Sequence, residues 1–263
     1  MTAKTDAQHP TPAERFFFDT NGYLALESFL PADLVTDLLQ ALGSAIERRR
    51  EKQLAGTARE NEARFVLGNS RIFGLLEDDP LFLDLMDYAP VMPYVRGLLN
   101  PEAHYHASDA IWEVENPDEG PHWHRDGREA GYSLFRPQVP HLQIKIGYFL
   151  SDMTQPDQGN LTIVPGSHHA TVDPPPSQLA AFDSMPGAMQ LRVPPGTCVM
   201  FHNAVWHTPG RWTASRGERI VLYYAYEHPW MMAAYQARYT RGFYQGLSPE
   251  RKRMFHEVAF EVA

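Results

Sequence analysis

The sequence contains a single cysteine, Cys198, among its 263 residues. No internal disulfide can form, which fits a protein of a reducing compartment. The first twelve residues are polar and lack the apolar core of a signal peptide, and no run elsewhere is long and apolar enough to span a bilayer. We therefore expect a cytoplasmic protein that does not enter the membrane.

Positive charge is also scarce. The chain has 23 lysine and arginine residues against 32 aspartate and glutamate residues, and its formal net charge is -9. A chain this acidic lacks the electrostatic footprint of a nucleic-acid-binding protein. The one dense basic run, 48–50, is followed by Glu51 and is interpreted as the solvated end of a helix. We expect no nucleic-acid partner, and the oligomeric state stays open.

Glycine-rich phosphate loops and alternating strand–helix units are absent from the sequence, which disfavours a Rossmann or P-loop fold. Instead, the first hundred residues favour helices, with apolar residues at helical spacing from Leu34 to Ile46. From about residue 104 onward, short β-rich runs alternate with Pro, Gly and Asn turns. These runs are 110–114, 142–150, 160–164, 189–193, 197–202 and 219–226.

Many short strands with irregular loops predict a sandwich or jelly roll that is mainly β with flanking helices. The length suits a single domain over 1–263. Within it we expect a disordered leader over 1–12, a mostly helical flank over 13–100, a β core over 104–228 and a helical C-terminal segment over 229–263.

One segment is dense in metal-ligating residue types. It reads Pro-His-Trp-His-Arg-Asp-Gly over 121–127. On an extended strand, residues two apart point to the same side, so His124 and Asp126 can reach one metal ion together. An isolated H-x-D is weak on its own, because the histidine can be an ordinary strand residue and the aspartate a turn former before glycine.

A third ligand would have to come from another part of the chain. The segment 201–209 follows a strong strand and offers two histidines, of which His207 lies after several intervening strands. Two imidazoles and one carboxylate on one face of an octahedron leave three positions open for other ligands. That arrangement is typical of non-haem Fe(II) oxygenases.

A basic residue follows the distal histidine at the start of another strand. The co-substrate 2-oxoglutarate has a distal carboxylate that needs a charge-assisted, preferably bidentate partner. We favour Arg219 over Arg216, because a strand residue is better pre-organised than a loop residue. Arg216 stays the alternative, and one of the two could simply pair with Glu218 or Glu227.

With these motifs in place, the sequence resembles the phytanoyl-CoA dioxygenase family of Fe(II)/2-oxoglutarate oxygenases. Trp-His-Arg-Asp over 123–126 is similar to the family's W-H-x-D, and 201–207 is similar to its F-H-x-x-x-x-H. The stretch 159–168 resembles its G-x-L-x-x-x-P-G-S-H. The similarity covers nearly the whole chain and also includes 16–24, 145–152 and 223–226.

The resemblance implies a double-stranded β-helix, a cupin-like jelly roll flanked by helices. It implies Fe(II) as cofactor, with 2-oxoglutarate and O2 as co-substrates. By motif match, His124, Asp126 and His207 would be the iron ligands, and Arg219 would hold the distal carboxylate. Weaker matches place Lys145 and Arg71 beside the same co-substrate.

The chain also departs from the family pattern. Pro209 stands where many relatives have a small hydroxyl residue two positions after the distal histidine, and Thr208 is expected to substitute. The family's Asn between that histidine and the arginine is replaced by Trp212, and the arginine is displaced by about one residue, which keeps Arg216 open.

An aspartate at position 126 fills the space that a halide would need. We therefore predict hydroxylation, or a related oxidation such as desaturation, of an unactivated C–H bond of a small molecule. The segment 127–141 is expected to close over the iron as a lid, and its arginines suit an anionic substrate unless they are merely exposed on a loop. The residues expected to contact substrate are Trp112, His122, Arg128, Tyr132, Arg136 and Gln143.

Two alternatives differ in kind from an oxygenase. A cupin-type isomerase that uses zinc or manganese would show no dependence on 2-oxoglutarate. A non-catalytic metal-binding protein that keeps the fold would bind iron weakly or tolerate substitution at Asp126. The full ligand set together with a carboxylate-binding arginine favours the oxygenase.

Overall fold

The computed structural model describes residues 9–59, 62–114, 120–127, 135, 137–213, 217–231 and 239–256. Helices and strands alternate irregularly along these ranges. The helices are α1 (Pro12–Asn21), α2 (Ala32–Leu54), α3 (Pro80–Met86), α4 (Met92–Leu98), α5 (Pro176–Leu179), α6 (Arg241–Gly246) and α7 (Pro249–Lys252), and the short 3-10 turns are η1 (Leu75–Glu77), η3 (Ser167–His169) and η4 (Phe182–Ser184). The strands are β1 (Tyr23–Leu26), β2 (Ala63–Val66), β3 (Asn69–Phe73), β4 (His104–Glu113), β5 (Gln143–Phe149), β6 (Leu161–Ile163), β7 (Met189–Gln190), β8 (Thr197–His202), β9 (His207–Pro209) and β10 (Arg219–Glu227).

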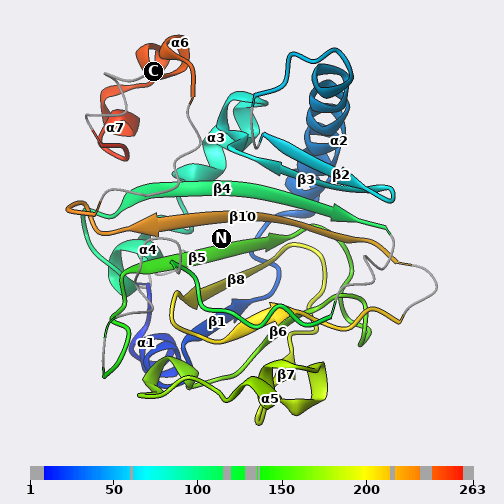
Figure 1. The fold of residues 1–263 in the computed structure, drawn as a ribbon. Coiled ribbons are helices and arrows are strands. Elements are labelled where there is room, and N and C mark those ends of the chain that lie inside the picture. Colours follow the sequence, from blue (N-terminus) through cyan, green and yellow to red (C-terminus); the bar gives the residue numbers. More distant parts are fainter. Residues whose placement is uncertain are drawn as a thin grey trace, which may run out of the picture.

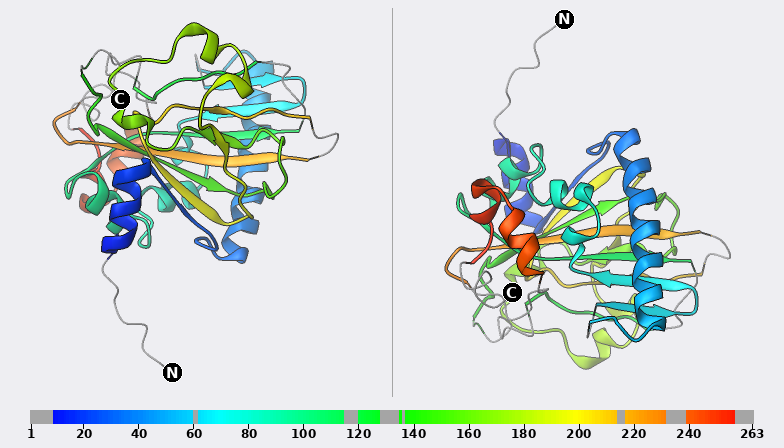
Figure 2. Two further views of the ribbon diagram at one scale, coloured as in Figure 1. Left: turned by 90° about the horizontal axis from the view of Figure 1, so that it is seen from below. Right: turned by 90° about the horizontal axis from the view of Figure 1, so that it is seen from above.

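The strands form two sheets. Seven strands lie in the order β1-β8-β5-β10-β4-β3-β2, and a smaller sheet has the order β7-β6-β9 (Figure 1). All the neighbouring pairs in the register are antiparallel. Figure 2 shows α2 crossing one face of the large sheet, while the segment that carries β6 and β7 lies on the opposite side.

Alternation along the central strands separates two apolar cores. Ile144 and Ile146 of β5 point to the helical side and pack with α2, α3 and α4 in the larger core. Phe149 of β5 and Val221 of β10 point the other way and pack against Leu161 of the small sheet. Because successive side chains of a strand face opposite sides, the second face of β5 is left to line the space between the sheets.

The predicted fold class, mainly β with flanking helices, is confirmed. The runs predicted over 142–150, 197–202 and 219–226 coincide closely with β5, β8 and β10. The segment expected as a mostly helical flank over 13–100 contains α1 to α4, and it also contains β1, β2 and β3, which join the large sheet. These strands have only four or five residues each, too few to show a period of two against the helical pattern around them.

Residues 9–12 of the leader expected over 1–12 are described by the structure. The hydroxyl of Thr11 accepts a hydrogen bond from the backbone N–H of Glu14, and the Glu14 side chain accepts one from the backbone N–H of Thr11. This reciprocal cap fixes the start of α1 at Pro12. Residues 1–8 lie outside the described residues. None of the helices in the described ranges combines the length and apolarity that crossing a bilayer requires.

Candidate active site

The small sheet brings two distant histidines side by side. His207 begins β9 opposite Ile163 of β6. His124 forms a β-bridge with His207, in which the backbone N–H of each donates to the carbonyl of the other at 3.0 Å. The extended backbone expected around His124 is therefore present only as this one bridge. Asp126 lies in the turn that follows, where its N–H donates to the carbonyl of Asn203 at 2.9 Å.

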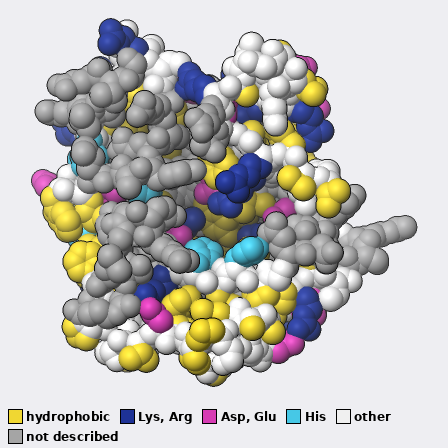
Figure 3. Space-filling model, viewed as in Figure 1, with side chains coloured by type: hydrophobic (Ala, Val, Ile, Leu, Met, Phe, Trp, Pro, Cys, Tyr) yellow, Lys and Arg dark blue, Asp and Glu magenta, His cyan; other side chains and the backbone are white. Residues whose placement is uncertain are grey.

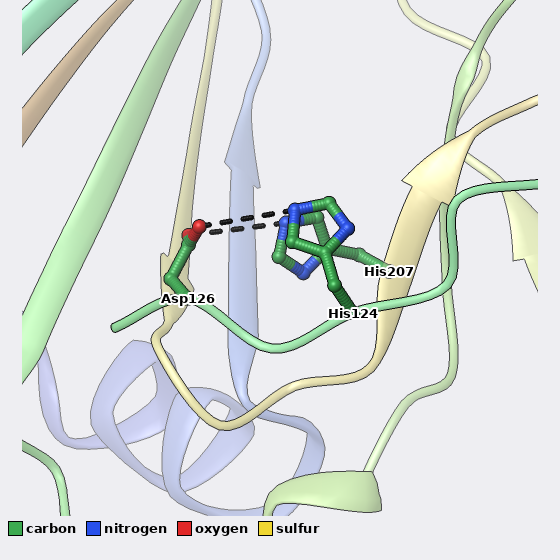
Figure 4. Close-up of side chains that lie close together, drawn as sticks. All are labelled: His124, Asp126 and His207. Atoms are coloured by element: carbon green, nitrogen blue, oxygen red, sulfur yellow. Dashed lines mark ion pairs between the residues drawn. The ribbon is translucent and has the colours of Figure 1, made fainter. Parts of the chain in front are cut away.

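Three side chains converge from these segments (Figure 4). His124, Asp126 and His207 each offer a ligand atom, and these atoms lie within 4.8 Å of one another. Asp126 Oδ1 is 3.9 Å from His124 Nε2, and Asp126 Oδ2 is 3.8 Å from His207 Nε2. Within the described residues, this is the group of histidine, cysteine and acidic side chains whose geometry could hold a metal ion.

Backbone carbonyls decide which nitrogen of each imidazole faces the cluster. His124 Nδ1 lies 2.6 Å from the carbonyl oxygen of His122, and His207 Nδ1 lies 2.9 Å from that of Val205. A carbonyl can only accept, so each Nδ1–H donates to it. Each Nε2 is therefore left with its lone pair for a metal ion, the arrangement that orients metal-binding histidines in general.

The charge state of the cluster also suits a cation. Burial raises the pKa of Asp126, but Lys145 and the two histidines lower it to about 2. Burial lowers the pKa of His207 to about 3. At neutral pH the cluster thus contains an ionised carboxylate and an uncharged imidazole, the states that metal binding requires. In the described structure, Asp126 Oδ2 is buried and lacks a hydrogen-bond partner, a deficit that a bound cation would remove.

A cavity of about 390 Å³ runs from His124 to Arg219, the first residue of β10. Figure 3 shows a hollow in this face of the molecule, with basic side chains on one side and histidines on the other. Arg219 is only 2% exposed, and its Nη1 donates to Glu113 Oε2 at 2.9 Å. Burial lowers the pKa of Arg219, but Glu113 and Tyr223 together outweigh burial, so the pKa is raised.

The residues expected to contact the co-substrate have different positions. Lys145 lies on the face of β5 that lines the space between the two sheets, which we call the inner face. Its Nζ is 3.6 Å from Asp126 Oδ1 and 5.1 Å from the ring centre of Tyr223. Arg71 of β3 lines the cavity, where its Nη2 donates to Asp109 Oδ2 at 2.8 Å. Both cations are therefore held in place by carboxylates before any ligand binds.

Thr208 requires a correction. Because it alternates with His207 and Pro209 on β9, its side chain points away from the cavity that Pro209 lines. Its hydroxyl accepts a hydrogen bond from the backbone N–H of His122 at 2.8 Å and donates one to the carbonyl of Pro209 at 2.9 Å. Thr208 therefore anchors the segment before His124 and does not replace the family's co-substrate contact.

The residues expected to bind substrate lie in different parts of the structure. Gln143 lies on the same inner face of β5 as Lys145, and His122 lines the cavity. Trp112 requires a correction, because it points to the outer face of β4 and packs against the larger core beneath α2. Outside the described residues lie Arg128, Tyr132, Arg136 and the alternative co-substrate ligand Arg216.

Sequence reasoning missed the acidic partners of the two arginines. Asp109 and Glu113 lie on the inner face of β4, on either side of Ile111. Their alternation with Ala110 and Trp112 is a period-two signal, and it could have indicated polar residues that face the cavity. Nothing in the sequence indicates the roles of the backbone carbonyls of His122 and Val205, because those depend on the local fold.

A jelly roll that holds two histidines and one aspartate around a single point is typical of non-haem iron oxygenases. A family model described as phytanoyl-CoA dioxygenase matches residues 18–220. The chain belongs to this family, which confirms the resemblance seen in its W-H-x-D and F-H-x-x-x-x-H motifs. No relative among curated protein sequences matches the chain.

Several solved structures share the fold. HygX from Streptomyces hygroscopicus, with nickel, 2-oxoglutarate and hygromycin B bound, is 18% identical and has a TM-score of 0.67, covering 86% of this chain and 90% of that one. EctD from S. alaskensis with bound Fe is 19% identical, with a TM-score of 0.67 and coverage of 87% and 80%. SnoN, a non-haem alpha-ketoglutarate-dependent epimerase from nogalamycin biosynthesis, is 15% identical, with a TM-score of 0.57 and coverage of 82% and 80%.

Family membership and the metal-binding geometry of the cluster confirm the predicted cofactor set, Fe(II) with 2-oxoglutarate and O2 as co-substrates. They also confirm the general class, a dioxygenase of this family.

Proposed function

We propose that this protein hydroxylates, or otherwise oxidises, an unactivated C–H bond of a small molecule, with succinate and CO2 as co-products. The observation that carries the proposal is the convergence of His124, Asp126 and His207, together with a cavity that both His124 and Arg219 line. Three ligands on one side of a metal leave the other side for a co-substrate and O2.

In this proposal, His124 and His207 bind Fe(II) through Nε2 and Asp126 binds it through a carboxylate oxygen. When bound, Fe(II) would supply open coordination positions and the activation of O2, which is the oxidant of the substrate C–H bond. Lys145, 3.6 Å from Asp126 Oδ1, keeps that carboxylate ionised and oriented. The carbonyls of His122 and Val205 hold the two imidazoles in the required tautomer.

Arg219 holds the distal carboxylate of 2-oxoglutarate in the same proposal. Arg219 is buried and lines the cavity, and its Nε lacks a partner among the described residues. The Nη1 of Arg219 already donates to Glu113, and the neighbouring Nε–H can donate to a carboxylate that enters the cavity. Arg71, which lines the same cavity, adds positive charge there, and Arg216 stays the alternative ligand.

A small-molecule substrate is supported by the size of the cavity and by what is bound in two structural neighbours. One contains hygromycin B, and EctD contains 5-hydroxyectoine, the latter at 21% identity and a TM-score of 0.66. The expected anionic character of the substrate rests on Arg128 and Arg136, so it stays a prediction. Given the single cysteine, we also place the protein in the cytoplasm.

Succinate release tests the proposal. The full chain is incubated with candidate metabolites, with and without Fe(II) and with and without 2-oxoglutarate. Release that needs both, and a product heavier than its substrate by one oxygen or lighter by two hydrogens, supports the proposal. Turnover without 2-oxoglutarate would favour a cupin isomerase, and tight iron binding with no turnover of any metabolite would favour a non-catalytic metal-binding protein.

A further inference from the structure

The inner face of the large sheet has a second polar end, opposite Arg219. β10 contains 9 residues, so at about 3.4 Å per residue its ends lie roughly 27 Å apart. In the strand register, Arg219 lies opposite Glu113 at one end, and Glu227 lies opposite His104 and Gln143 at the other. Lys145, which contacts the metal cluster, pairs with Ala225 in the register. The Glu227 end is thus only about 7 Å along the sheet from the residue that contacts Asp126.

Glu227 is fully buried at this end and holds an imidazole that faces the cluster. Its Oε2 lies 2.7 Å from His106 Nδ1, and its Oε1 lies 3.2 Å from His256 Nε2. The amide nitrogen of Gln143 lies 3.2 and 3.3 Å from the two ring nitrogens of His106. His106 is also near enough to the metal cluster to help lower the pKa of Asp126.

The contact with Glu227 determines what His106 can recognise. A carboxylate accepts, so His106 Nδ1 carries the proton and its Nε2 has a lone pair. The ring therefore offers an acceptor backed by a buried negative charge, which a ligand would share with the amide nitrogen of Gln143 that lies 3.3 Å from Nε2. Such a pair attracts a group that donates hydrogen bonds and is itself positive.

Charge elsewhere on this face is already balanced. The other buried or half-buried carboxylates on the inner face each have a basic side chain as partner. These pairs are Glu113 with Arg219, Asp109 with Arg71, and Asp126 with Lys145. Among the described residues, Glu227 contacts imidazoles and neither lysine nor arginine, so it is the carboxylate on this face that lacks a permanent cation.

We propose that His106, backed by Glu227, binds an ammonium group of the substrate and so places the rest of the molecule beside His124, Asp126 and His207. The substrate class that this subsite selects is therefore amines, and this inference rests on the proposed oxygenase function. It lies on the opposite side of the cluster from Arg219, so it does not compete with 2-oxoglutarate.

The contact between Glu227 and His256 offers a different explanation, in which the carboxylate merely ties the chain beyond α7 to the sheet. An anchoring role needs both Glu227 and His256, but it does not depend on the charge of a ligand. Binding measurements with probes matched in shape and different in charge therefore separate the two.

The experiment uses the full chain loaded with Zn(II), which does not react with O2, and with 2-oxoglutarate. Ligand-observed NMR measures the dissociation constants of cyclohexylammonium, cyclohexanol and cyclohexanecarboxylate. We expect the wild-type protein to bind the ammonium probe about tenfold to a hundredfold more tightly than the alcohol, because a charge-assisted hydrogen bond contributes that much. The Glu227→Gln variant should lose this preference.

Glu250→Gln is the matched control, because it removes one negative charge from an exposed residue that pairs with Arg253. It should keep the preference, as should His256→Asn, which breaks only the anchoring contact. If Glu227→Gln does not fold, His106→Phe serves in its place, since it removes the acceptor and keeps the carboxylate.

A wild-type protein with no preference for the ammonium probe overturns the inference, as does a preference that survives both Glu227→Gln and His106→Phe. The dissociation constant of 2-oxoglutarate is measured in the same samples. If 2-oxoglutarate binds normally while the ammonium preference is absent, only the subsite is wrong. If 2-oxoglutarate does not bind at all, the proposed function itself fails.

Discussion

At the scale of single residues, the candidate metal centre depends on backbone groups as much as on side chains. Val205 and His122 contribute carbonyls that hold His207 and His124 in one tautomer. Thr208 contributes a hydroxyl that fixes the backbone of His122. Substitutions at the ligands and at their supports should therefore affect metal binding through different causes, loss of a ligand atom or loss of its orientation.

His207→Ala tests the third ligand. It removes one of three ligand atoms, so iron content should fall from one equivalent to a small fraction of it, measured by elemental analysis after gel filtration. His169→Ala is the control, because that histidine is exposed and bonds to Asp19 and Gln138 outside the cluster. Iron that stays stoichiometric in His207→Ala would place the third ligand elsewhere.

Arg219→Ala tests the co-substrate contact. Loss of a charge-assisted partner for a carboxylate should raise the dissociation constant of 2-oxoglutarate about tenfold to a hundredfold, measured by anaerobic calorimetry with Fe(II) present. The change also leaves Glu113 without its cation, so the melting temperature should fall. Arg71→Ala, at a half-exposed position that pairs with Asp109, should have a smaller effect on both. An effect of Arg216→Ala alone would reverse the preference for Arg219.

At the scale of elements, a group of histidines packs between α1 and the strands. His141 and His202 stack with their ring centres 4.2 Å apart, and His168 lies 5.0 Å from His202. His168 and His169 also bond through Nε2 to the carbonyl of Asp19 in α1. Burial lowers the pKa of His141 to about 3 and lowers those of His168 and His202 as well.

Stability should therefore fall as the solution becomes acidic. The unfolded chain takes up protons at these histidines below their usual pKa of 6.5, whereas folded His141 stays neutral down to about 3. At pH 5.5 the neutral state of His141 costs about 1.4 kcal/mol of folding free energy, and His168 and His202 add to this in the same direction. Urea unfolding from pH 7.5 to 5.5 measures the slope, which should be shallower in His141→Phe because that variant keeps the ring and loses the titration. An unchanged slope would contradict the assignment.

At the scale of the whole molecule, the candidate site joins segments from both sheets. His207 and the bridge to His124 belong to the small sheet, and Lys145 and Arg219 belong to the large one. Ligands that contact both sheets bind the folded state only, so they should stabilise the whole molecule.

We expect Fe(II) and 2-oxoglutarate together to raise the melting temperature. At ligand concentrations about a hundred times the dissociation constant, the added free energy is about 2.7 kcal/mol, a shift of several degrees for a chain of this size. Anaerobic thermal denaturation measures the shift, and a chelator should reverse it. Metal and co-substrate that leave the melting temperature unchanged would contradict a site shared by both sheets.

The sequence by itself determined the parts of this protein that local patterns encode. Spacing within W-H-x-D and F-H-x-x-x-x-H identified His124, Asp126 and His207, because ligand chemistry demands these residue types. β-rich runs between Pro, Gly and Asn turns located β5, β8 and β10 within a residue or two. The two-residue spacing of Gln143 and Lys145 placed both side chains on one face of their strand, because successive side chains of a strand alternate whatever the fold around them.

Only the tertiary structure decided which of the other residues meet. It paired Arg219 with Glu113 and Arg71 with Asp109. It turned Trp112 into the larger core and Thr208 away from the cavity. It also brought Glu227 to His106. Each of these contacts joins residues from different strands or segments. Strand order and register set such contacts, and neither is encoded in the pattern of one segment.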